Sequence, residues 1–391
     1  MYLEQLHLKN FRNYTHASLQ FSKHVNIFIG NNAHGKTNLL ESIYFLALAR
    51  SHRTNKDNEL ILFNKKNAYI SGDLFLRGQK VALEIMLSDR GKQAKSNHLE
   101  RKKLSDYIGT MNVIMFAPED LELVKGSPAI RRNFIDRELG QMDKIYLYHV
   151  SQYQQILKLR NEYLKQLRQK KAHDTLYLDI LTEQLAAEGA EVLARRLVFT
   201  HQLEKWAQPI LADISRQKET LAINYQSSLP SSEALLENEE ENTITMALNE
   251  AFLNAYRKIQ AKEIEQGTTT IGPHRDDLSF FVNGQNVQNF GSQGQQRTTS
   301  LSVKLAEIEL MKEQTGEYPI LLLDDVLSEL DDQRQTHLLY SIQKKVQTFL
   351  TTTSIEGVHT KLLQSPKLFE IENGQILSEN YLEKGQIREK R

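Results

Sequence analysis

The fold is decided by eight residues near the start of the chain, Gly30-Asn31-Asn32-Ala33-His34-Gly35-Lys36-Thr37. They match the phosphate-binding pattern G-x-x-x-x-G-K-[ST] at every fixed position. Residues 25–29 before the loop are mostly apolar and predict a buried strand, and residues 38–49 have the pattern of a helix. The backbone amides of such a loop and the N-terminus of the following helix hold phosphate groups. We therefore assign the eight loop residues and Asn38 to ATP, with Lys36 on the β- and γ-phosphates and the Thr37 hydroxyl on Mg²⁺.

A second stretch joins a run of aliphatic residues to two carboxylates: Ile320-Leu321-Leu322-Leu323-Asp324-Asp325. Continuous apolar runs are typical of buried parallel strands, and ligands of doubly wound sheets lie at the carboxyl ends of such strands. Asp324 is expected to hold Mg²⁺, and Asp325 to orient and deprotonate the attacking water as the catalytic base. Two acids can also be an ordinary strand-end cap, but the phosphate loop in the same chain favours the catalytic interpretation.

A third stretch opens a strong helical pattern: Ser292-Gln293-Gly294-Gln295-Gln296-Arg297. Ser292 is predicted to be the N-cap, and a helix N-terminus is a second phosphate site. A capped surface helix is the simpler interpretation of the same residues. However, the segment resembles the signature motif of ABC-type ATPases, which contacts the γ-phosphate held by the opposite subunit. That resemblance implies that Ser292, Gly294 and Gln295 contact ATP across an ATP-dependent homodimer.

Several further segments carry a resemblance to one family: residues 8–14 (Leu-Lys-Asn-Phe-Arg-Asn-Tyr), 50–53, 116–121, 126–128 with Arg131-Arg132, and 272–278 (Gly-Pro-His-Arg-Asp-Asp-Leu). Over nearly all of its 391 residues the chain resembles the bacterial RecF recombination-mediator family. The resemblance implies an ATP-dependent DNA-binding protein of recombinational repair and replication, active in the SOS response. Such a protein dimerises on ATP, binds single-stranded or gapped DNA, and helps RecO and RecR load the recombinase. Its enzymatic activity would be weak, DNA-stimulated ATP hydrolysis.

Composition limits the class of protein. The 49 basic and 49 acidic residues balance, so the whole molecule has no electrostatic preference for DNA. The chain has no cysteine, which excludes disulfides and thiolate metal sites and fits a reducing cytoplasm. It also lacks an apolar stretch of about 18 residues and a secretory signal, so we expect a cytoplasmic protein without a membrane partner.

The charge is unevenly distributed along the chain. Residues 50–103 contain 13 basic and 6 acidic residues, a net charge of +7. Because phosphate contacts dominate nucleic-acid affinity, this basic segment is a candidate DNA surface. The residues that we assign to DNA are Arg50, Arg53, Lys56, Arg101, Lys102 and Lys103. Such a run is also typical of a solvated basic face, and Arg50 or Arg53 could contact the nucleotide instead, since both closely follow the phosphate-loop helix.

We predict an α/β fold: an ABC-type P-loop ATPase head built from both chain ends, with an inserted, mainly helical second domain. The expected boundaries are 1–118 and 270–371 for the two parts of the head, 119–269 for the insertion, and 372–391 for a polar tail. Two long helical patterns within residues 128–216 should pack antiparallel as a short arm. A hairpin that turns at Asn283-Gly284 is expected to return the chain to the head.

Two other classes of protein share a phosphate loop. A transporter ATPase subunit is the main alternative, but such subunits lack a helical arm and usually carry a switch histidine. Here the corresponding strand end reads Phe349-Leu350-Thr351-Thr352-Thr353-Ser354. A small-molecule phosphotransferase has no use for the signature segment. The turn that carries a γ-phosphate-sensing Gln in ABC-type relatives reads Ala117-Pro118-Glu119-Asp120, so the sensing residue is not identified.

Overall fold

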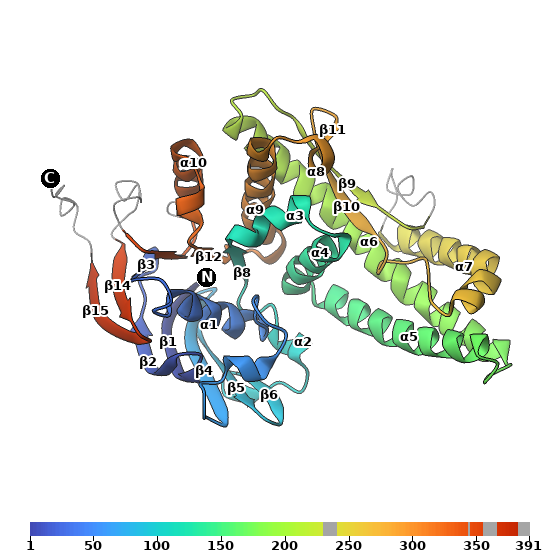
Figure 1. Cartoon of the computed structure of the whole chain (residues 1–391), viewed down its shortest axis with the longest axis horizontal. Coiled ribbons are helices and arrows are strands. Elements are labelled where there is room, and N and C mark those ends of the chain that lie inside the picture. The colour runs from blue at the N-terminus through green and yellow to red at the C-terminus, as the bar shows by residue number, and fades with distance from the viewer. Residues whose placement is uncertain (230–240, 343–344, 355–365, 382–391) are drawn as a thin grey trace. The chain divides into compact units, whose positions relative to one another are not determined.

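The computed structural model describes residues 1–229, 241–342, 345–354 and 366–381. The chain divides into two compact units, shown with their elements in Figure 1. The first unit comprises residues 1–120, 213–216 and 301–391, and the second comprises residues 121–212 and 217–300. A head made from both chain ends and an inserted unit were expected. The division differs from the expected one at residues 270–300, which belong to the inserted unit.

The first unit contains an antiparallel sheet with the strand order β2-β1-β4-β5-β6-β7. Its strands are β1 (Tyr2–Phe11), β2 (Tyr14–Gln20), β4 (Asn67–Leu76), β5 (Gln79–Ser88), β6 (Gly91–Ser96) and β7 (Leu99–Glu100). Buried side chains alternate with more exposed ones from His16 to Gln20 in β2 and from Ala82 to Ser88 in β5, which is the pattern of a sheet with one face on the core. β1 and β2 therefore belong to a different sheet from the strand that enters the phosphate loop.

The second sheet of this unit has the order β15-β14-β3-β13-β12-β8. Its strands are β3 (Val25–Ile29), β8 (Val113–Phe116), β12 (Ile320–Asp324), β13 (Thr348–Thr352), β14 (Lys367–Glu372) and β15 (Gln375–Tyr381). The five strands from β14 to β8 run parallel, and β15 is an antiparallel edge. β15 occupies part of the expected polar tail, 372–391; residues 382–391 lie outside the described part of the chain.

Helix α1 (Lys36–Leu48) lies between the two sheets and contacts strands of both. Every residue from Leu39 to Leu48 is buried, including the polar Glu41 and Ser42, and a helix that is mostly apolar on every side is stable only inside a core. Helix α2 (Leu104–Tyr107), helix α10 (Asp332–Ile342) and two short 3-10 helices, η1 (Asp57–Leu60) and η4 (Val326–Glu329), also lie wholly in this unit. Helix α9 (Gln293–Thr315) begins in the second unit and ends in the first.

The second unit is mainly helical. It contains α3 (Glu122–Lys125), α4 (Pro128–Met142), α5 (Lys144–Arg168), most of α6 (Thr175–Ile214), α7 (Glu241–Gln266) and α8 (Val287–Phe290). A small sheet has the order β11-β10-β9, with β9 (Leu221–Gln226), β10 (Asp277–Val282) and β11 (Gln285–Asn286). The predicted hairpin at Asn283-Gly284 is present, but β10 pairs with β9 and so stays in this unit. Its expected return to the head was wrong.

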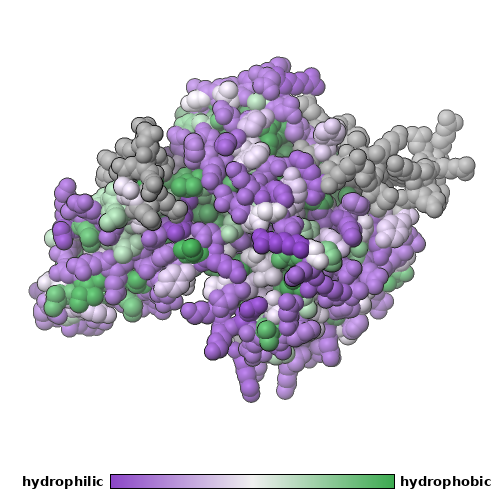
Figure 2. All heavy atoms as spheres, turned by 180° about the vertical axis from the view of Figure 1, so that it is seen from behind, coloured by the Kyte–Doolittle hydropathy of each residue, from purple (hydrophilic) through white to green (hydrophobic). Residues whose placement is uncertain are grey.

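Helices α5 and α6 form the predicted antiparallel arm. Tyr146 bonds to Arg196, His149 to Glu188, and Arg160 to Thr182, so positions rise along one helix as they fall along the other. Asp143 caps α5 through bonds from two backbone amides. Hydrophilic residues cover most of the face shown in Figure 2. Within the described residues, no helix is both long enough and apolar enough to span a bilayer.

Candidate functional site

The phosphate loop follows β3, and Gly35 caps α1 in a left-handed conformation at φ 113°. The next residue, Lys36, is only 8% exposed. Its Nζ donates to the carbonyl oxygens of Gly30 and Asn31 at 2.7 and 2.9 Å. Burial lowers the pKa of Lys36, while the nearby Asp325 and Asp324 act in the opposite direction. The lysine ammonium is thus held over the loop by carbonyl groups that a phosphate can replace.

Two hairpin turns from different sheets support this loop, and the sequence did not reveal them. The hydroxyl of Tyr14 donates to the Gly35 carbonyl at 3.0 Å. The His34 carbonyl accepts from the side-chain amide of Asn13 at 3.3 Å and from the backbone amide of Gly374 at 2.9 Å. Asn13 and Tyr14 lie in the segment 8–14 that carries the family resemblance, but nothing local in that segment predicts contact with residue 374.

Gly30 is required by close packing of the same loop. A Cβ at this position would lie 2.2 Å from the backbone oxygen of Ile371 in β14. Any side chain here would therefore push the loop away from the strand. The glycine of the phosphate-binding pattern is explained by this contact with the sheet, which brings the loop close to the C-terminal hairpin.

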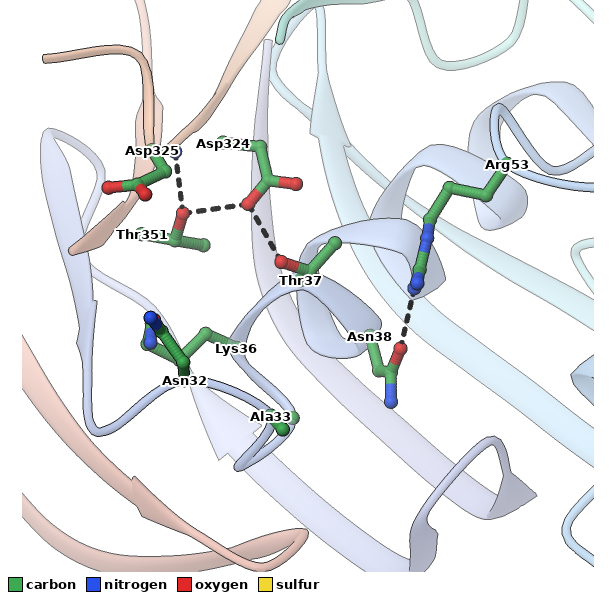
Figure 3. A pocket seen from close by; sticks show the side chains of 10 residues that line it. Asn32, Ala33, Lys36, Thr37, Asn38, Arg53, Asp324, Asp325 and Thr351 are labelled. Carbon is green, nitrogen blue, oxygen red and sulfur yellow. Dashed lines mark hydrogen bonds between the residues drawn. The ribbon is translucent and has the colours of Figure 1, made fainter. Parts of the chain in front are cut away.

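The acidic strand end lies beside the loop. β12 ends at Asp324, whose Oδ1 accepts from the hydroxyls of Thr37 at 3.0 Å and Thr351 at 2.8 Å (Figure 3). Burial raises the pKa of Asp324, and the two hydroxyl bonds oppose that rise. A carboxylate and a hydroxyl form the oxygen donor set that Mg²⁺ prefers in phosphate-loop proteins. The residues present therefore fit the ion predicted from the sequence.

Asp325 adopts a left-handed backbone conformation, with φ 52° and ψ 20°. Its amide donates to the hydroxyl of Thr351 at 2.9 Å, and its side chain is exposed to the pocket. The pocket has a volume of about 360 Å³. All of its lining residues belong to the first unit: Asn32, Ala33, Gly35, Lys36, Thr37, Asn38, Arg53, Asp324, Asp325 and Thr351. Thr351 was noted in the sequence as a strand-end residue but was not given a role.

Arg53 was assigned to DNA, and the structure places it on the wall of this pocket. Its guanidinium donates to the side-chain oxygen of Asn38 at 2.9 Å and lies 3.6 Å from the buried Glu41 carboxylate. Glu41 also binds Arg12 through two hydrogen bonds of 2.8 Å, which help to lower its pKa against the effect of burial. A nucleotide contact, the alternative role considered for Arg53, therefore matches its position better than a DNA contact.

The remaining predicted DNA residues are exposed and belong to the first unit. Lys56 lies 3.7 Å from Glu59, whereas Arg101, Lys102 and Lys103 occupy the connection between β7 and α2. A surface pair such as Lys56–Glu59 contributes little to stability, so it does not fix the lysine in a structural role. The assignment of these exposed basic residues to DNA stays a prediction.

The signature segment forms a capping box at the start of α9. The Ser292 hydroxyl accepts from the Gln295 amide at 3.2 Å, and the Gln295 side chain accepts from the Ser292 amide at 3.0 Å. The predicted N-cap at Ser292 is therefore confirmed. The Gln295 side chain also donates to Glu219 at 2.9 Å, while the Gly294 carbonyl accepts from Thr298 at 2.9 Å. These contacts fix the helix start, and the predicted contact with a partner's nucleotide remains to be tested.

Comparison with known proteins agrees with this arrangement. The chain matches the family described as the RecF/RecN/SMC N terminal domain over residues 2–375. It also has the fold of a solved Smc head bound to the C-winged helix domain of ScpA, with a TM-score of 0.55 at 16% identity, covering 98% of each chain. The fold and the site thus define an ATPase head of the RecF/RecN/SMC class, as the sequence predicted.

More similar relatives identify the branch of that class. The chain is 58% identical to the DNA replication and repair protein RecF of Latilactobacillus sakei, over 97% of this chain and 99% of the relative. It is 52% identical to the protein of that name from Bacillus subtilis, over 96% and 100% of the two chains. A solved structure of the recombination mediator protein RecF-ATP in the RecFOR pathway is 34% identical, with a TM-score of 0.87 over 98% of each chain. The chain belongs to the RecF family.

Proposed function

We propose that this chain is an ATP-dependent DNA-binding protein of recombinational repair and replication. The observation that carries the proposal is the meeting of Thr37 with Asp324 beside Lys36, because these are the three side chains that hold Mg·ATP in phosphate-loop proteins. Family membership and the ATP-bound relative support the same function. Within the described residues, no observation favours the transporter alternative.

ATP binding would use the loop and the two side chains at its end. The backbone amides of residues 30–37 would surround the phosphates, and Lys36 Nζ would leave its two carbonyl acceptors for the β- and γ-phosphates. Thr37 and Asp324 would hold Mg²⁺, which neutralises charge on the phosphate oxygens when it is bound. Arg53 and Asn38 bond to each other and line the same pocket as Lys36 and Asp324, and they would also contact the nucleotide.

Hydrolysis would use Asp325 as the base. Its exposed carboxylate accepts a proton from a water molecule as the water oxygen bonds to the γ-phosphorus. The bond from that phosphorus to the bridging oxygen breaks, and its electron pair stays on ADP. The products are ADP and phosphate, and Asp325 then returns its proton to solvent. Slow turnover of this kind serves a switch, since hydrolysis ends the ATP-bound state.

Dimerisation would complete the site. The N-terminus of α9, with Ser292, Gly294 and Gln295, would bind the γ-phosphate held by a second copy of the chain. An anion at this end is favoured by the helix dipole and by backbone amides that lack helical partners. ATP would then join two heads, and neither copy alone would form a complete hydrolysis site.

DNA binding would use the exposed basic residues Arg50, Lys56, Arg101, Lys102 and Lys103, on single-stranded or gapped DNA. We further propose that the protein works with RecO and RecR in the cytoplasm, loads the recombinase and takes part in the SOS response. The support is family membership and a solved relative described as a mediator in the RecFOR pathway.

Analytical ultracentrifugation tests the proposal with ATP, with ADP and without nucleotide, each with and without gapped DNA. We expect a dimer with ATP, monomers in the other two states, and DNA in the ATP-bound species. A parallel assay should show slow ATP turnover that DNA stimulates. A chain that stays monomeric and does not bind DNA with ATP would contradict the proposal.

A further inference from the structure

The hydroxyl of Thr351 connects the two acidic residues of the site. Thr351 is 1% exposed and lies directly beside Asp324 in the register of β13 and β12. Its hydroxyl donates to Oδ1 of Asp324 at 2.8 Å and accepts from the amide of Asp325 at 2.9 Å. Both bonds are drawn in Figure 3, where the two carboxylates point away from each other. One buried hydroxyl therefore contacts both the predicted Mg²⁺ ligand, Asp324, and the predicted catalytic base, Asp325.

The bond to Asp325 stabilises an unfavourable backbone conformation. Asp325 is left-handed at φ 52°, and a residue with a side chain costs on the order of 1 kcal/mol or more in such a conformation. The strained turn ends β12, so the chain enters the next helical turn with the Asp325 side chain exposed in the pocket. Without an acceptor at Thr351, the Asp325 amide would lose its hydrogen bond and the turn would lose this support.

The bond to Asp324 fixes the other carboxylate. Oδ1 of Asp324 accepts two hydroxyl bonds, one from Thr37 on the phosphate loop and one from Thr351 on the neighbouring strand. Thr37 would turn toward the ion in the nucleotide-bound state, which leaves Thr351 as the donor that holds the carboxylate. A threonine suits this place because its hydroxyl both donates and accepts, and its branched side chain has few rotamers.

We propose that Thr351 is a positioning residue, whose hydroxyl directs Asp324 toward the ion site and Asp325 toward the attacking water. This inference rests on the proposed function, and it adds that the two acids are oriented jointly from β13. Because a shift of about 1 Å in a catalytic group can lower a rate by about 100-fold, loss of one hydroxyl should affect turnover far more than nucleotide affinity.

The test compares Thr351→Val, which keeps the shape and removes the hydroxyl, with Thr351→Ser, which keeps the hydroxyl. Thr348→Val is the matched control on the same strand. Thr348 is also 1% exposed, and its hydroxyl has no hydrogen-bond partner among the described residues. Thermal unfolding of all three variants shows whether the fold is kept, and Thr348→Val should unfold at or above the wild-type temperature.

We expect Thr351→Val to lower kcat by about 10- to 100-fold and to raise KM by a much smaller factor, and Thr351→Ser to restore most of the turnover. A second measurement does not depend on hydrolysis: the ratio of affinities for a fluorescent ATP analogue with and without Mg²⁺. This ratio should fall in Thr351→Val and stay unchanged in Thr348→Val.

Two outcomes would overturn the inference. In the first, Thr351→Val keeps wild-type turnover and wild-type Mg²⁺ dependence. In the second, Thr351→Ser is as impaired as Thr351→Val, and the effect then comes from packing and not from the hydroxyl. If wild-type protein binds the analogue but does not hydrolyse ATP, the proposed hydrolysis fails, and the Mg²⁺ ratio still decides the role of Thr351.

Discussion

The hydroxyl of Thr37 donates a hydrogen bond of 3.0 Å to Oδ1 of Asp324, a residue 287 positions further along the chain. This contact joins the phosphate loop at one end of the chain to the acidic strand at the other. Nucleotide binding therefore depends on both chain ends being folded together, and substitutions at either end should affect the same step.

Lys36→Arg should lower ATP turnover by on the order of 100-fold and weaken nucleotide binding. Lys36 is buried with its ammonium bonded to two loop carbonyls, and the longer, planar guanidinium does not fit that space. Turnover and analogue binding are measured beside Lys9→Arg, an exposed position on β1. Normal turnover in Lys36→Arg would mean that the loop is not the phosphate site.

Asp325→Asn should bind Mg·ATP but lose the base, with turnover reduced by about 100-fold or more. The amide keeps the shape of the side chain and tolerates the same left-handed backbone. ATP should therefore hold this variant as a dimer for longer than the wild-type protein, whose dimer dissociates as its ATP is hydrolysed. Sedimentation with ATP checks this, with Asp89→Asn at an exposed turn as control. A monomeric Asp325→Asn protein would show that Asp325 is not the base or that ATP does not drive association.

Ser292→Arg tests the composite site. The substitution removes the cap of α9 and places a cation at the positive end of the helix dipole, where the partner's phosphate is expected. The variant should bind ATP nearly as well as wild type, since its own phosphate loop is intact, but it should not dimerise or hydrolyse ATP.

Mixing this variant with Lys36→Arg provides the geometric control. A mixed dimer has at most one interface with an intact loop facing an intact signature, so partial ATP-dependent association is expected. If Ser292→Arg alone loses ATP affinity as severely as Lys36→Arg does, the site lies within one subunit.

Lys102→Glu together with Lys103→Glu should weaken DNA binding and flatten its salt dependence. Loss of two phosphate contacts reduces the magnitude of the negative slope of log K against log salt by roughly 1.4 to 1.8. The matched control is Lys170→Glu with Lys171→Glu, an exposed lysine pair at the turn between α5 and α6. Equal losses in both double variants would indicate a general charge effect and would place the DNA surface elsewhere.

Acid should destabilise the second unit through His274. Burial lowers the pKa of His274 to about 4 from 6.5, with Arg275, Arg132 and Arg196 acting in the same direction. The unfolded state therefore binds the proton first, and stability is lost as pH falls from about 6.5 to about 4. The loss from this group is at most about 3 kcal/mol.

His274→Gln checks this expectation. Glutamine is neutral throughout and can still accept the hydrogen bond that joins His274 to Tyr153 at 2.7 Å. Its urea unfolding free energy should fall less steeply over the same pH range than that of the wild type. Parallel curves for the two proteins would show that His274 is not a source of the acid sensitivity.

Local sequence patterns predicted the parts of the site that each element carries by itself. The strand before the loop, the acidic end of β12 and the cap at Ser292 follow from residue types within a few positions. Contacts between turns that are distant in the chain could not be predicted, because strand pairing across hundreds of residues leaves no periodic pattern in the sequence. The hydrogen bond from Gly374 to His34 and the two hydrogen bonds of the Thr351 hydroxyl belong to this group.

The pairing of β3 with β13 and β14 has a consequence for synthesis on the ribosome. Val25 lies opposite Thr348, and Asn26 lies opposite Lys367, so both neighbours of β3 are translated more than 320 residues after it. At rates of roughly 5–20 residues per second, β3 waits about 15 to 65 s with both of its edges unpaired. During that interval its unpaired backbone edges are open to association with other nascent chains. The sheet around β3 can therefore form only after β13 and β14 have been translated, whereas the inserted helical unit can fold while the chain is still growing.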